Sequence, residues 1–182
     1  MNERIILGID PGTNIMGYGI ISVKANKISL VATDVINMSK MDDSFEKMKL
    51  VFRTIYALIE THSVDEVAIE APFFGKNVQS MLKLGRAQGV AMAAALYKNI
   101  PIFEYSPKRI KQSITGNGNA SKEQVAAMLQ SLLVIKDMPK HLDATDGLAA
   151  AVCHYFQRTN KQKEKNYSGW KAFLSDHPKK IV

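Results

Sequence analysis

The order of its apolar segments is the feature that most constrains the fold of this 182-residue chain. Three β-rich runs come first, and helical and strand-like segments alternate after them. The predicted strands are residues 5–10, 17–23, 28–35, 64–70 and 102–105. The predicted helices are residues 45–59, residues 78–97, a short one from Pro107, one from Ser121 and a last one from Asp143 to about Gln157. This order predicts an α/β fold in which helices cover a mixed sheet.

Composition narrows the class of protein further. Hydrophobic residues make up 46% of the chain and charged residues 23%, which is typical of one globular domain and excludes disordered, collagenous and coiled-coil chains. The single cysteine, Cys153, excludes an internal disulfide and a thiolate zinc site. The N-terminus lacks a secretion signal, and no apolar run approaches the ~20 residues of a membrane span. We therefore expect a cytoplasmic protein that makes no membrane contact.

Positive charge is concentrated near the C-terminus. The formal net charge is +7, and residues 158–182 contain seven basic and two acidic residues. We expect a domain over residues 1–157 and a basic tail over 158–182. Such an excess favours a polyanionic partner, although a solubilising tail explains the tail's composition equally well. Basic residues also gather within the domain at Lys76, Lys83 and Arg86, and at Lys108, Arg109 and Lys111.

Four carboxylates stand at positions that suggest a metal site. Asp10 ends the first predicted strand and Glu70 ends the fourth, and α/β sheets place their sites at such strand ends. Asp143 and Asp146 are three residues apart, so they share one face of the last predicted helix. Oxygen ligands without a Cys/His cluster favour Mg²⁺ or Mn²⁺ over zinc. Two such ions can hydrolyse a phosphodiester.

Each acid also has a structural explanation when it is considered alone. Asp143 can cap its helix, Asp146 can complement the helix dipole, and Glu70 can belong to a turn. For any single acid this explanation is the stronger one. The combination of two strand-end acids with an acidic pair in a basic protein favours the metal site.

Several segments match, in order, the motifs of a known family. They are GIDPGT at 8–13, AIE at 68–70 followed by Phe73 and Lys76, LKLGR at 82–86, and DATDGLA at 143–149. The set resembles RuvC-type Holliday junction resolvases over about residues 4–157. The opening segment alone is less specific, because actin-like ATPases begin similarly.

The resemblance implies a ribonuclease-H-like fold, a mixed five-stranded sheet flanked by helices, in a homodimer. It implies a Mg²⁺-dependent endonuclease, with Mn²⁺ as a substitute and two ions per site. Such an enzyme makes paired symmetric nicks in four-way DNA junctions during homologous recombination and DNA repair, together with the RuvA–RuvB branch-migration complex. Asp10, Glu70, Asp143 and Asp146 match the family's metal-binding acids.

The resemblance also suggests DNA-binding residues. Phe73 matches an aromatic that stacks on an unpaired base, and Lys111 and Lys122 match lysines near the DNA and the scissile phosphate. The other candidates for phosphate contacts are Lys76, Lys83, Arg86, Lys108 and Arg109. Core or turn packing for Phe73, and solvated surface charge for the lysines, are the alternatives.

Two other functions are alternatives to the nuclease. An actin-like ATPase or sugar kinase shares the 8–13 type of loop, but it needs two such domains and a second glycine-rich phosphate loop, which this chain lacks. A non-catalytic junction-binding protein does not require the four acids that are present here. The small residues of 78–97 further suggest that this helix forms part of a dimer interface.

Overall fold

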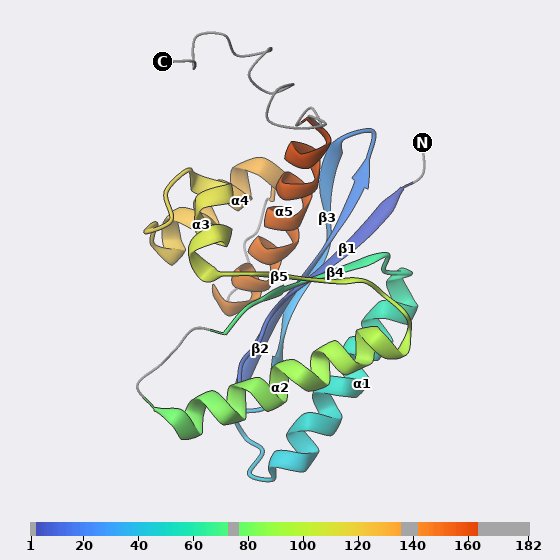
Figure 1. Cartoon of the computed structure of the whole chain (residues 1–182), viewed down its shortest axis with the longest axis vertical. Helices are drawn as coiled ribbons and strands as arrows, with labels where there is room; N and C mark the ends of the chain where they lie inside the picture. Colours follow the sequence, from blue (N-terminus) through green and yellow to red (C-terminus); the bar gives the residue numbers. More distant parts are fainter. Residues whose placement is uncertain (1–2, 73–76, 136–141, 164–182) are drawn as a thin grey trace, which may run out of the picture.

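A five-stranded mixed sheet forms the centre of the molecule (Figure 1). The computed structural model describes residues 3–72, 77–135 and 142–163. The strands are β1 (Arg4–Asp10), β2 (Ile15–Lys24), β3 (Lys27–Asn37), β4 (Glu66–Glu70) and β5 (Ile102–Tyr105). They lie in the order β3-β2-β1-β4-β5. β2 is antiparallel to both β1 and β3, whereas β4 is parallel to both β1 and β5. The predicted α/β class and mixed five-stranded sheet are confirmed.

Helices cover both faces of this sheet (Figure 1). They are α1 (Ser44–His62), α2 (Val78–Tyr97), α3 (Pro107–Thr115), α4 (Lys122–Leu133) and α5 (Leu142–Lys163). α1 and α2 pack on one face, and α5 packs on the other with α3 and α4 beside it. Because strand side chains alternate, Ile6 of β1 joins the core under α5, while Leu7 and Ile9 join the core under α1 and α2. β1 is therefore buried on both faces, as its apolar sequence predicts.

Side-chain caps begin three of the helices at the residues that the sequence suggests. Asp43 accepts hydrogen bonds from the first-turn amides of α1. Ser106 caps α3, with Pro107 at its first position. Ser121 and Gln124 form the reciprocal capping box of α4. The predicted starts of α3 at Pro107 and of α4 at Ser121 are therefore confirmed.

Glycines let α5 lie unusually close to the sheet. A Cβ atom placed on Gly8 of β1 would stand 2.1 Å from the carbonyl oxygen of Gly147, and one placed on Gly147 would stand 2.5 Å from Cα of Tyr18. Only a residue without a side chain fits at either position. The close approach brings the first turns of α5 to the end of β1 where Asp10 lies.

The last helix is longer than predicted. It continues to Lys163, so Arg158, assigned from its charge to the basic tail, lies on α5. Residues 164–182 of that tail lie outside the described residues, and the division into domain and tail stays a prediction. The fourth strand begins at Glu66 instead of Val64, because α1 continues to His62 and its C-cap, Ser63, has a left-handed conformation. In the part of the chain that the structure describes, no helix has both the length and the apolar character needed to cross a membrane.

Candidate active site

The carboxyl ends of β1 and β4 bring Asp10 and Glu70 together. β1 and β4 are parallel neighbours in which Ile9 lies opposite Ile69. Asp10 and Glu70, the residues that follow this pair, therefore lie at the same edge of the sheet. The first turns of α5 add Asp146 at this edge. A cavity of about 300 Å³ is lined by charged residues from five elements, namely Asp10, Glu70, Lys111, Lys122 and Asp146.

The electrostatics show that these carboxylates repel one another. Burial, followed by the charges of Glu70 and Asp146, raises the pKa of Asp10 to about 8. Burial and the charge of Asp146 raise the pKa of Glu70 to about 7. The pKa of Asp146 is also raised, chiefly by burial. Negative charge at this site is therefore disfavoured until a cation compensates it.

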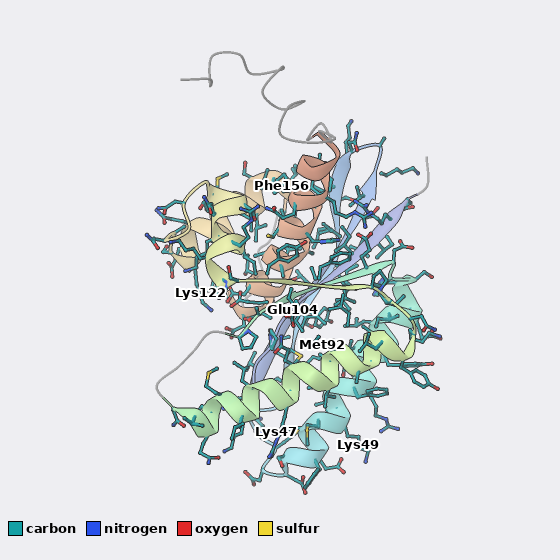
Figure 2. The ribbon with its side chains drawn as sticks, in the orientation of Figure 1. Lys47, Lys49, Met92, Glu104, Lys122 and Phe156 are labelled. Atoms are coloured by element: carbon teal, nitrogen blue, oxygen red, sulfur yellow. The ribbon has the colours of Figure 1, made fainter. Side chains whose placement is uncertain are left out.

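Lys122 supplies such a positive charge in this structure. It is the first residue of α4, and Figure 2 shows it on the side of the sheet covered by α3, α4 and α5. Its ammonium group contacts the Asp146 carboxylate closely and lies 3.6 Å from Oδ1 of Asp143. Burial opposes the charge on Lys122, but the Asp146 carboxylate outweighs this effect and the pKa of the lysine is raised. Asp143 thus belongs to the same charge cluster, although it does not line the cavity.

The donor set fits a hard divalent cation by its chemistry. Across residues 3–72, 77–135 and 142–163, no three or more His, Cys, Asp or Glu side chains already stand in a metal-binding arrangement. Oxygen donors from Asp10, Glu70 and Asp146 nevertheless share one cavity, and their raised pKa values indicate uncompensated negative charge. A divalent ion would supply the positive charge that Lys122 supplies here.

The predicted DNA-binding residues fall into separate places. Lys111 and Lys122 line the acidic cavity. Lys108 and Arg109 are exposed on α3, and the Arg109 guanidinium contacts the side chain of Gln157 on α5. Phe73 and Lys76 lie outside the described residues.

The other two candidates, Lys83 and Arg86, line a second cavity of about 390 Å³ between the start of α1 and α2. Lys47 of α1, which sequence reasoning missed, also lines it (Figure 2). The Lys47 ammonium donates to Oδ1 of Asn14 at 2.9 Å and to the carbonyl oxygen of Thr13 at 3.5 Å. It therefore supports the loop that follows Asp10, a contact that no local pattern around Lys47 signals.

The mixed sheet, with acids at two strand ends and on the last helix, fits the ribonuclease-H-like class of nucleases. The profile of the family described as "Crossover junction endodeoxyribonuclease RuvC" matches residues 6–154. Proteins of that name from Christiangramia forsetii and Bacteroides fragilis are 61% and 55% identical to this chain. The alignments cover 99% and 100% of this chain, and 94% and 97% of those proteins.

A solved structure agrees with these matches. It is Thermus thermophilus RuvC in complex with Holliday junction substrate, which is 30% identical to this chain with a TM-score of 0.81. The match covers 87% of this chain and 96% of that one. The chain therefore belongs to the RuvC family of crossover junction endodeoxyribonucleases, and the family predicted from the sequence is confirmed.

Proposed function

We propose that this protein is a metal-dependent endonuclease that resolves four-way (Holliday) DNA junctions by paired symmetric nicks, in homologous recombination and DNA repair. The observation that carries the proposal is the shared cavity of Asp10, Glu70 and Asp146, in a chain whose residues 6–154 match the RuvC family. We also propose the cytoplasm as its location, where its DNA substrate is found.

The acids have a defined role in this proposal. Asp10, Glu70 and Asp146, with Asp143 beside them, would hold Mg²⁺, with Mn²⁺ as a substitute and two ions per site. Ions of this kind activate a water molecule and stabilise the leaving oxygen during phosphodiester hydrolysis. In that reaction the water oxygen bonds to phosphorus, one phosphorus–oxygen ester bond breaks, and the leaving oxygen gains a proton.

Lys111 and Lys122, the two lysines that line the cavity, are proposed to bind the scissile phosphate. Lys122 is held by Asp146 and Asp143 here, so its ammonium group can turn to the scissile phosphate once those carboxylates have another cation. Lys111, which lines the same cavity, offers a second positive charge. Both would stabilise charge that develops on the phosphate in the transition state.

The remaining basic residues are proposed to hold the junction arms. Lys83 and Arg86 line a cavity with Lys47, while Lys108 and Arg109 are exposed on α3 beside the acidic site. Lysine and arginine contacts to phosphates dominate affinity for DNA without reading its sequence. Lys76 for the phosphates and Phe73 for stacking on a base remain proposals from the family resemblance.

We propose a homodimer in which α2 contacts its counterpart. The apolar residues Val78, Leu82 and Leu96 of this helix are exposed, and a Cβ atom at Gly85 or Gly89 would meet nothing within 4 Å. These residues recur at helical spacing, so they form one face that a second helix can approach closely. Cooperation with the RuvA–RuvB complex is proposed from the family alone.

A synthetic four-way junction tests the proposed function directly. The protein is incubated with labelled junction and Mg²⁺, and the cut positions on all four strands are mapped. We expect nicks at symmetric positions in two opposed strands, and sedimentation should give a dimer at micromolar concentration. Cleavage of an RNA–DNA hybrid in place of the junction, or no cleavage of either, would contradict the proposal.

A further inference from the structure

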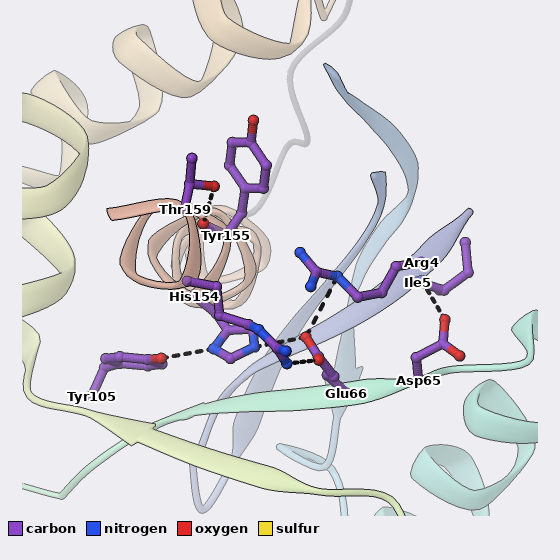
Figure 3. Close-up of polar contacts among 9 residues, drawn as sticks. Arg4, Ile5, Asp65, Glu66, Tyr105, His154, Tyr155 and Thr159 are labelled. Atoms are coloured by element: carbon purple, nitrogen blue, oxygen red, sulfur yellow. Dashed lines mark hydrogen bonds and ion pairs between the residues drawn. The ribbon is translucent and has the colours of Figure 1, made fainter. Parts of the chain in front are cut away.

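A second carboxylate on β4 lies away from the acidic cavity and is surrounded by partners. Glu66, at the opposite end of this strand from Glu70, is only 6% exposed. Figure 3 shows its contacts: Nε2 of His154 lies 2.8 Å from Oε2, Nε of Arg4 lies 3.6 Å from Oε2, and the Arg158 guanidinium contacts Oε1. The Tyr105 hydroxyl lies 2.7 Å from Nδ1 of His154. We call these five residues the Glu66 network.

The protons of this network can be assigned. His154 is completely buried, and burial lowers the pKa of its ring, which favours the neutral imidazole. Burial raises the pKa of Tyr105 to about 12, so its hydroxyl keeps its proton. The Tyr105 hydroxyl then donates to Nδ1, and the Nε2 proton is donated to Glu66. The reverse tautomer would set a bare nitrogen against a carboxylate, which is unfavourable.

The network connects the same two elements that meet at the acidic cavity. Glu66 and Glu70 are the ends of β4, and His154 and Asp146 both belong to α5. From Glu66 to Glu70 the strand advances about 13 Å. From His154 back to Asp146 the helix advances about 12 Å. These spans are nearly equal, and both ends of β4 meet α5: His154 lies beside Glu66, and Asp146 lines one cavity with Glu70. Fixing His154 beside Glu66 therefore helps to keep Asp146 near Glu70.

The contacts of α5 with the other strands differ in kind from its contact with Glu66. Where α5 crosses β1, Gly8 lies close against the backbone of Gly147 and Ala151. Apolar side chains of α5 such as Leu148 and Val152 pack in the core, whereas the contact between His154 and Glu66 is a directional polar contact with β4. A slide by one residue would move Asp146 by about 1.5 Å along the helix axis. A directional contact such as that between His154 and Glu66 prevents such a slide.

We propose that Glu66 and His154 are positioning residues for the metal site, because together they set the axial position of α5 on β4 and hence the separation of Asp146 from Glu70. Tyr105 orients the His154 ring, and Arg158 and Arg4 balance the carboxylate charge. The inference rests on the proposed function, since it assumes that Asp146 and Glu70 share a metal.

Variants of the full-length protein without DNA test this inference, with free Mn²⁺ measured by electron paramagnetic resonance. We expect His154→Leu to weaken Mn²⁺ binding about tenfold or more, as loss of supporting residues does at other metal sites. Tyr105→Phe, which removes a single hydroxyl, should weaken it about threefold, since one hydrogen bond is modest. His154→Gln, which retains a donor toward Glu66, should bind more tightly than His154→Leu.

Tyr155→Phe is the matched control. Its hydroxyl also ties α5 to the sheet, by a 2.7 Å hydrogen bond to the carbonyl oxygen of Asn26, but it does not touch the network. We expect Tyr155→Phe and Tyr105→Phe to lower the thermal midpoint similarly, while only Tyr105→Phe weakens Mn²⁺ binding. If the Tyr105 hydroxyl had a purely structural role, the two variants would change the Mn²⁺ affinity equally or not at all.

The outcomes separate the inference from the proposed function. Unchanged Mn²⁺ affinity in folded His154→Leu and Tyr105→Phe proteins overturns the inference while the wild type still binds Mn²⁺ and cuts junctions. If His154→Leu does not fold, Tyr105→Phe decides alone. A wild-type protein that binds no Mn²⁺ overturns the metal site itself, and the inference with it.

Discussion

Glu66 and Glu70 are the same residue type at the two ends of one five-residue strand, yet their surroundings are opposite. Glu66 is met by two guanidinium groups and an imidazole. Glu70 faces two further carboxylates, Asp10 and Asp146, and its pKa is raised to about 7. One end of β4 has compensated its charge within the chain, whereas the other end has an excess that an external cation can compensate.

The contrast shows how a single scaffold separates stability from function. A buried carboxylate with its partners holds elements together, and removing one partner leaves an uncompensated charge. A cluster of like charges lowers stability but provides binding energy for a cation. α5 spans both ends, since it carries His154 and Asp146.

The largest expected effect is on catalysis at the uncompensated end. Asp10→Asn or Glu70→Gln should reduce junction cleavage about 10³-fold or more. When catalytic residues act as a unit, removing one of them costs nearly as much activity as removing all of them. Junction binding should persist, since phosphate contacts by basic residues supply most of the affinity. Cleavage is measured on synthetic junctions with Mg²⁺, and binding by gel shift without metal.

Asp65→Asn is the control for this experiment. Asp65 directly precedes β4 and accepts a 2.7 Å hydrogen bond from the Ile5 amide, away from the acidic cavity. It should cut junctions at a rate close to the wild type. Retention of cutting by Asp10→Asn and Glu70→Gln would remove these acids from the site.

The next largest expected effect is a difference in the free energy of unfolding between variants at the two ends of β4. Glu66→Leu should lower the free energy of unfolding by about 2–3 kcal/mol, because the buried His154 loses its hydrogen-bond partner and the partly exposed Arg4 and Arg158 lose their counter-charge. Glu70→Leu should be neutral or stabilising in the metal-free protein, because it removes repulsion from Asp10 and Asp146. Urea unfolding in the presence of a chelator measures both variants. Equal losses would show that the two ends of β4 do not differ in this way.

The smallest expected effect is a pH dependence of stability. The pKa of Asp10 rises from 3.8 to about 8 on folding, and that of Glu70 from 4.5 to about 7. The folded state therefore binds more protons than the unfolded state between about pH 4 and pH 8, so these groups make stability fall as pH rises through that window.

Asp10→Asn sharpens this prediction. Without metal, the variant should be more stable than the wild type by roughly 1–3 kcal/mol at pH 8, a size common for single stabilising changes. The difference should be small near pH 4, where Asp10 is protonated in the folded state and about half protonated in the unfolded state. Chemical unfolding at the two pH values measures it, and a difference that does not change with pH would show that Asp10 is not under electrostatic stress.

The sequence predicted the acidic end of the sheet far better than the compensated end. Asp10 and Glu70 each end an apolar run, and strand ends are visible from local pattern. The bounds of α2 and the start of the helix at Ser121 were likewise predicted from local pattern, and both are confirmed.

The Glu66 network had no such signal. Glu66 is the first residue of β4, and its partners His154 and Arg158 are 88 and 92 residues away in the sequence. Only the packing of α5 on β4 brings them together. Arg158 was assigned to the basic tail because charge counting cannot show which cation has a buried partner. Lys122 was predicted from the family resemblance, but its contact with Asp146 depends on how α4 packs against α5.

The most direct test of the central claim is calorimetric titration of the chelator-treated protein with Mn²⁺ at pH 7, in buffers of different ionisation enthalpy. The account predicts binding with release of protons from the carboxyl cluster, because metal ligands must be deprotonated. Binding should be strongly weakened in Asp10→Asn and Glu70→Gln and retained in Asp65→Asn. Mn²⁺ binding that is equally tight in all four proteins, with no proton release, would contradict it.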